Sequence, residues 1–122
     1  MGDFHDLKVW QKAHELTIDI YRTTAEFPKQ ERYGLVSQMR RCAVSVGSNI
    51  AEGRGRRGEA EFVRFMQIAS GSLTELEYQL LLSRDLKYLP ESEYQVINRK
   101  LAEVSRMLLS LQQKVKAASA AN

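Results

Sequence analysis

The chain has 122 residues, of which 43% are hydrophobic and 27% charged, and its formal net charge is +3. This length suits one domain with a single buried core, and this composition excludes disordered and fibrous chains. No apolar run approaches the roughly 18 residues that a membrane span needs, so we expect no contact with a membrane.

The first two predicted elements are helices at 6–26 and 33–53. Apolar residues recur at helical spacing in both. The first helix is expected to end before Pro28, because the residue before a proline is disfavoured in a helix. The apolar stripe of the first helix consists of Val9, Ala13, Leu16 and Ile20, widened by Trp10 and Tyr21. That of the second consists of Leu35, Met39, Cys42, Val46 and Ile50.

The next two predicted helices, at 59–87 and 91–117, carry heptad seams, in which apolar residues step by three and four. Glu59 and Glu61 at the start of the third helix are favourable beside a helix N-terminus, and Pro90 suits the first turn of the fourth. The third seam is Phe62, Met66, Ala69, Leu73, Leu76 and Leu80. The fourth is Tyr94, Ile97, Leu101, Val104, Leu108, Leu111 and Val115.

These elements predict an all-α fold. Short loops between long helices make neighbouring helices antiparallel, so we expect an up-down antiparallel four-helix bundle that occupies residues 1–122 as a single domain. The C-terminal residues lack an apolar stripe, and we expect them to fray.

The stretch GRGRRG, residues 53–58, matches the glycine pattern of a dinucleotide-binding turn, but that turn requires a preceding strand. Here a helical stripe precedes the glycines and a second helix follows. We therefore expect them to end the second helix with a left-handed residue and to let the chain reverse. We call residues 53–58 the hinge loop.

The basic excess of the chain is concentrated around the hinge loop. Residues 40–64 hold six arginines and three glutamates, and arginine matches the geometry of phosphate groups. The candidate nucleic-acid-binding residues are Arg54, Arg56, Arg57, Arg64, Arg40 and Arg41. Phosphate binding and simple solvation remain open for the hinge-loop arginines. For Arg40 and Arg41 the alternative is an ion pair with Glu75 or Glu77, or with Glu52 of a neighbouring chain.

A second face of the second helix carries small polar residues, which allow another backbone to approach closely. We predict a close crossing of the second and third helices, and a steric reason for Gly71, because glycine inside a helix costs about 1 kcal/mol relative to alanine. The candidate structural and interface residues are Ser45, Ser48, Asn49, Glu52, Gly53 and Gly71.

The sequence offers no catalytic constellation. HELTI, at 14–18, begins like a zinc-protease motif, but Ile18 stands where its second histidine is required. Cys42, the single cysteine, lies in an apolar stripe and is expected to be a core residue in a reducing cytoplasm. We therefore expect no enzyme, no metal, no cofactor and no small-molecule substrate.

Four stretches carry a resemblance to a known family: DLKVWQKAHEL, FPKQERYGLVSQMRRCAVSVGSNIAEG, EFVRFMQIASGSLTELEYQL and LKYL. Residues 4–89 closely resemble the bacterial 23S rRNA intervening-sequence proteins, also called four-helix bundle proteins, and the fourth helix follows by pattern. The resemblance implies an all-helical chain in a ring-like homopentamer and supplies no catalytic residues. This chain departs from the family in having Cys42 in place of alanine, and Gly47 in place of a proline that would kink the second helix.

Two functions follow as hypotheses. The first is an oligomeric, non-enzymatic scaffold that binds nucleic acid, RNA favoured, with several copies of a weak basic patch acting together. The second is a protein-interaction adaptor of the same ring that makes no direct contact with nucleic acid. A similar bundle is the accessory subunit of reverse transcriptases in diversity-generating retroelements, which is an analogy of fold.

Overall fold

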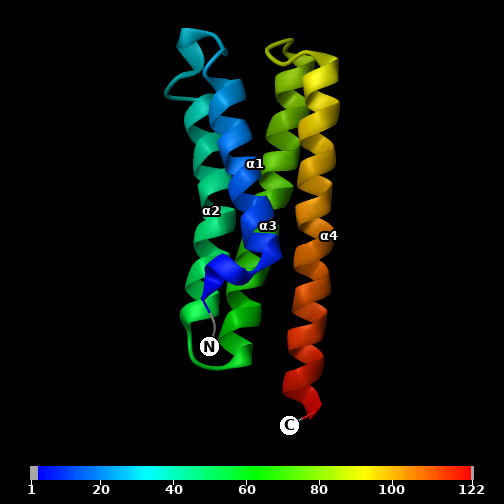
Figure 1. The fold of residues 1–122 in the computed structure, drawn as a ribbon. Helices are drawn as coiled ribbons and strands as arrows, with labels where there is room; N and C mark the ends of the chain where they lie inside the picture. Colours follow the sequence, from blue (N-terminus) through cyan, green and yellow to red (C-terminus); the bar gives the residue numbers. More distant parts are fainter. Residues whose placement is uncertain (1–2, 122) are drawn as a thin grey trace.

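The chain folds into four long helices in the computed structural model, which describes residues 3–121 (Figure 1). They are α1 (Lys8–Thr24), α2 (Leu35–Gly55), α3 (Glu59–Asp85) and α4 (Glu91–Ala121). Two single-turn 3-10 helices, η1 (Phe4–Asp6) and η2 (Lys29–Glu31), precede α1 and α2. No strand occurs within residues 3–121, and the predicted all-α fold is confirmed.

Each helix packs against two others. α1 contacts α2 and α4, and α3 likewise contacts α2 and α4, so the order around the bundle is α1, α2, α3, α4. The α2–α3 connection lies at the same end of the molecule as the start of α1 and the end of α4, and the other two connections lie at the opposite end (Figure 1). We call the first of these the hinge end.

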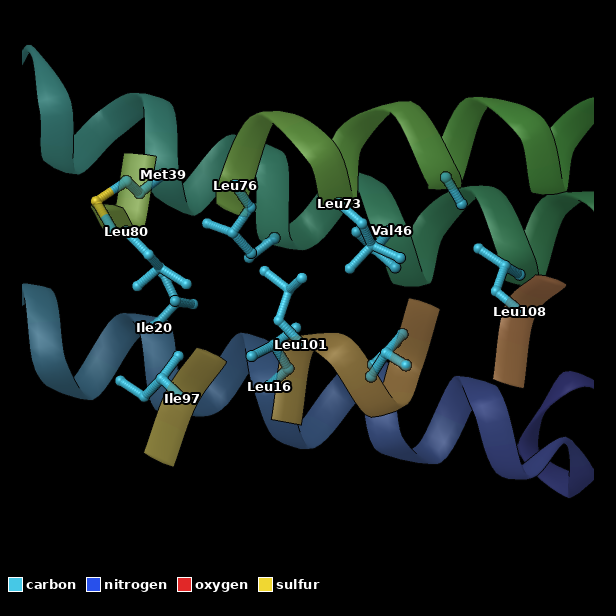
Figure 2. Close-up of a cluster of buried hydrophobic side chains, with 14 of the residues drawn as sticks. Leu16, Ile20, Met39, Val46, Leu73, Leu76, Leu80, Ile97, Leu101 and Leu108 are labelled. Carbon is cyan, nitrogen blue, oxygen red and sulfur yellow. The ribbon is translucent and has the colours of Figure 1, made fainter. Parts of the chain in front are cut away.

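One core fills the space between the four helices. Leu16 and Ile20 of α1 lie opposite Leu76 and Leu80 of α3, and Leu101 of α4 lies among them (Figure 2). The four central stripe residues of α1 are buried, as are every predicted seam residue of α3 and those of α4 as far as Leu108. Tyr21, predicted to widen the α1 stripe, is instead 42% exposed. Trp10 is partly covered, as expected.

The helix boundaries differ from the expected ones by a few residues. α1 is shorter than 6–26, and α2 is displaced by two residues from 33–53. α4 continues to Ala121, so the part of the C-terminal tail that the structure describes is helical rather than frayed. Alanine has the highest helix propensity of all residues, and the alanines at 117, 118 and 120 extend α4 although they are exposed.

The glycines of the hinge loop have other roles than predicted. α2 runs through Gly53 and Gly55, and its C-cap, Arg56, is extended. The left-handed residue is Gly58, whose φ is +90°, at the start of α3. A Cβ on Gly53 would lie 2.7 Å from the Cβ of Phe65, so Gly53 is where α2 and α3 approach too closely for any side chain.

Gly71 does not have the predicted steric reason. It is exposed, and a Cβ there would have no atom within 4 Å. The middle of the α2–α3 contact is instead made by the hydroxyls of Ser45 and Ser72, 2.8 Å apart. α2 also passes Gly47 as one uninterrupted helix.

Two glycine-to-alanine substitutions are expected to change the free energy of unfolding in opposite directions. Gly53→Ala forces a methyl group into Phe65 and should destabilise the fold by about 1–3 kcal/mol. Gly71→Ala adds a methyl group in open space and should stabilise it by about 0.5–1 kcal/mol. Urea unfolding followed by circular dichroism measures both, and equal effects would contradict the close approach at Gly53.

Candidate nucleic-acid interface

Two phenylalanines near the start of α3 support the arginines around the hinge loop. The guanidinium carbons of Arg56 and Arg64 lie 5.2 and 4.6 Å from the ring centre of Phe65. That of Arg54 lies 5.9 Å from the ring of Phe62. These are cation–π distances. Both rings are buried, so they position the arginines and are not available to stack on bases.

Two of the four arginines around the hinge loop are ion-paired. Arg56 donates to Glu52 at 2.6 Å, and Arg64 donates to Glu61 at 3.1 Å. The hydrogen bond from Arg64 lowers the pKa of the Glu61 carboxyl below its usual value. All four side chains are about half exposed, and exposed pairs of this kind are weak. A phosphate group that binds an arginine in a bidentate geometry competes well with such a pair.

The other two arginines, Arg54 and Arg57, make no ion pair within residues 3–121. Arg57 is exposed. Arg54 is half-buried, and its Nε is shielded from solvent and has no hydrogen-bond partner. Arg54, Arg56 and Arg57 lie together at the α2–α3 turn, and Arg64 shares the Phe65 ring with Arg56; we call these four residues the arginine cluster.

Sequence patterns did not identify one further cation at the hinge end. Lys116 of α4 lines a shallow pocket with Glu59, Ala60 and Val63 at the start of α3. It lies 52 positions after Arg64 in the chain. Only the antiparallel packing of α3 and α4 brings it to the hinge end, and no local motif signals that position.

Arg40 and Arg41 lie away from the arginine cluster. Arg40 donates to Thr24 Oγ1 at 3.0 Å and to the Tyr21 carbonyl at 3.1 Å, and its guanidinium lies over the Tyr21 ring. It therefore binds the C-terminal end of α1, where a cation is favourable, and makes no pair with Glu75 or Glu77. Arg41 is exposed and likewise unpaired among the described residues. A separation of 14 residues along α2 places Arg40 about 20 Å from Arg54.

The small polar residues of α2 are largely used within the chain. Ser45 contacts Ser72 of α3, and the amide of Asn49 donates to the carbonyl and the hydroxyl of Ser45 at 2.8 and 3.0 Å. Ser48 is exposed and lines a shallow groove beside Trp10. The close crossing of α2 and α3 is thus present, while Ser48 alone of these three residues faces solvent.

Cys42 lies at the edge of the core. It is half-buried, and the Gln79 amide lies 3.5 Å from its sulfur. Burial raises the pKa of the thiol above its usual value, so the thiolate form is disfavoured. A nucleophilic cysteine needs the opposite shift.

The two histidines belong to an aromatic cluster. His14 stacks on Trp10 at 5.1 Å, and His5 stacks on Phe4 at 4.1 Å. No group of three potential metal-binding side chains occurs within the described range. No helix in the described part of the chain is both long and apolar enough to cross a membrane.

Comparison with known proteins agrees with the family resemblance seen in the sequence. The family model of the 23S rRNA-intervening sequence protein matches residues 5–110. A crystal structure of a protein with unknown function from the S23 ribosomal protein family of Bacteroides thetaiotaomicron is 27% identical to this chain, with a TM-score of 0.77. The match covers 85% of this chain and 97% of the other. No curated protein matches the chain.

Proposed function

The chain belongs to the 23S rRNA-intervening sequence protein family, and we propose that it is a non-enzymatic, oligomeric scaffold that binds nucleic acid, RNA favoured, through its hinge end. The proposal places it in the cytoplasm, in agreement with its single free cysteine.

One observation supports the proposal most strongly: the convergence of Arg56 and Arg64 on the ring of Phe65. Arg56 ends α2 and Arg64 belongs to α3, yet both guanidinium groups pack against one ring. Arginines prepositioned in this way lose less conformational freedom when they bind phosphate. Lys116 of α4 adds a cation to the same end of the bundle, in the pocket beside Glu59.

The predicted binding is weak for one chain. The four arginines of the cluster lie among three carboxylates, those of Glu52, Glu59 and Glu61. Several copies in one assembly would raise the affinity without new contacts within each copy. A ring-like homopentamer is the favoured assembly, and the exposed apolar side chains of α1 and α2 support an interface between copies. Ile18, Tyr21 and Val44 are 43%, 42% and 43% exposed.

The assembly has a direct test. Light scattering at micromolar concentration should return about five times the mass of one chain. Ile18→Glu places a charge on the exposed apolar face, outside the core, and should lower that mass while the helix content is retained. A single-chain mass for the parent protein would remove the homopentamer and the argument from multiple copies.

The arginine cluster has a test in the triple variant Arg54→Ser, Arg56→Ser, Arg57→Ser. Its affinity for single-stranded RNA should fall, and the slope of log affinity against log salt should flatten by about two units, because three fewer counterions are released. RNAs of unrelated sequence should lose affinity equally, since phosphate contacts carry no base information. Filter binding across a salt series measures both quantities.

A matched control removes the same charge from elsewhere. Lys29, Arg32 and Arg99 are exposed and make no ion pair among the described residues, and their replacement by serine should leave the salt slope nearly unchanged. If the two triple variants bind alike, or if the parent does not bind RNA or DNA at low salt, the adaptor function replaces this proposal.

The carboxylates that pair with the cluster provide a test in the opposite direction. Glu52→Gln together with Glu61→Gln releases Arg56 and Arg64 and should raise RNA affinity several-fold, in the range expected for two exposed ion pairs. Glu59→Gln removes a carboxylate at the same end that is in no ion pair with an arginine. If the single change gains half as much binding free energy as the double change, the gain per charge is equal; net charge alone would then explain the effect and the pairing would be irrelevant.

A further inference from the structure

A groove between the start of α1 and residues 106–114 of α4 lies outside the arginine cluster. At the hinge end α4 extends beyond the start of α1 (Figure 1). The groove has a volume of about 400 Å³ and is open to solvent. It occupies the edge of the bundle between α1 and α4, whereas the arginine cluster lies on the edge between α2 and α3.

Apolar side chains form the floor of this groove. Leu7, Met107 and Leu111 are only half-buried, and Val9 lies beneath them. Val115 follows Leu111 after one further turn and is also half-buried. The floor therefore presents a short apolar strip along the axis of α4 that α1 does not cover.

Three cations form the rim: Lys8, Arg106 and Lys114. All three are exposed, and none makes an ion pair or a side-chain hydrogen bond within residues 3–121. No carboxylate lines the groove.

Elsewhere along the α1–α4 contact, cations lie close to carboxylates of the neighbouring helix. Lys100 pairs with Asp19 at 2.6 Å, and Lys12 lies 3.9 Å from Glu103. Cations elsewhere along the same contact thus face carboxylates of the neighbouring helix. At the groove three cations lack an opposing carboxylate, so they are available to carboxylates of another molecule.

We propose that this groove binds an acidic amphipathic helix of a protein partner. The apolar face of the partner helix would cover the floor, and its flanking carboxylates would meet the three cations. Arg106 and Lys114 are eight residues apart, about 12 Å along α4, which matches two turns of a bound helix. This is the helix-in-groove mode of recognition.

The composition of the groove favours a peptide over a nucleic acid. An apolar floor offers nothing to a phosphate backbone, whereas it stabilises an apolar helix face by removing that face from water.

Fluorescence anisotropy with three labelled peptides of about 14 residues, roughly four helical turns, tests the proposal. The first has leucines at helical spacing on one face and glutamates beside them. The second has lysines in place of the glutamates. The third has the composition of the first in an order that breaks the leucine stripe. The parent protein should bind the first peptide and bind the other two at least tenfold more weakly.

Two protein variants localise the binding. Lys8→Gln, Arg106→Gln, Lys114→Gln should weaken binding of the acidic peptide by about tenfold, since each exposed charge pair contributes a factor of about two. Ser110→Glu places a carboxylate on the rim without altering the floor and should also weaken it. Lys29→Gln, Arg32→Gln, Arg99→Gln is the matched control and should bind like the parent.

Four results would overturn the proposal. Equal binding of the acidic and basic peptides excludes the charge complementarity, and equal loss in the two triple variants excludes the location. Displacement of the acidic peptide by unlabelled single-stranded RNA would assign the groove to nucleic acid. Loss of peptide binding in the serine triple variant of Arg54, Arg56 and Arg57 would mean that the groove has no separate role.

Discussion

The close approach of α2 and α3 at Gly53 is the constraint on which the candidate interface depends. Because Gly53 has no Cβ, the last turn of α2 lies directly against Phe62 and Phe65 of α3. That contact brings the ring of Phe65 beneath Arg56 and Arg64. A larger residue at position 53 would separate the two helices, and the arginines would lose their shared support. Packing and charge at the hinge end are therefore one structural feature.

The sequence predicts which face of each helix is buried, because burial follows directly from the spacing of apolar residues. It does not predict which side chains meet across two helices. Arg40 illustrates the difference, because it donates to the hydroxyl of Thr24 and to the backbone carbonyl of Tyr21, both on α1. Neither acceptor is a carboxylate, so charge complementarity in the sequence does not predict these contacts. Gly71 shows the converse, because a small residue inside a helix predicts a close contact and the packing makes none there.

The availability of a cation, rather than the count of cations, distinguishes the surfaces of this bundle. The net charge is only +3, and several basic side chains are held by carboxylates of the same or a neighbouring helix. Arg56 and Arg64 are held by exposed pairs that a phosphate can replace, whereas Lys100 is bound to Asp19, which is largely covered. Lys8, Arg106 and Lys114 face no carboxylate in their groove. Such differences arise from helix packing and are invisible in the composition.

The connectivity of the bundle explains why two such surfaces lie near one end. With three short connections and antiparallel neighbours, the α2–α3 turn has to share its end with the start of α1 and the end of α4 (Figure 1). The order of contacts around the bundle then separates the surfaces, because the α2–α3 edge lies opposite the α1–α4 edge. A nucleic acid on the arginine cluster and an acidic helix in the α1–α4 groove would therefore not compete for space. The same chain would hold both ligands at once, which is the geometry that a scaffold requires.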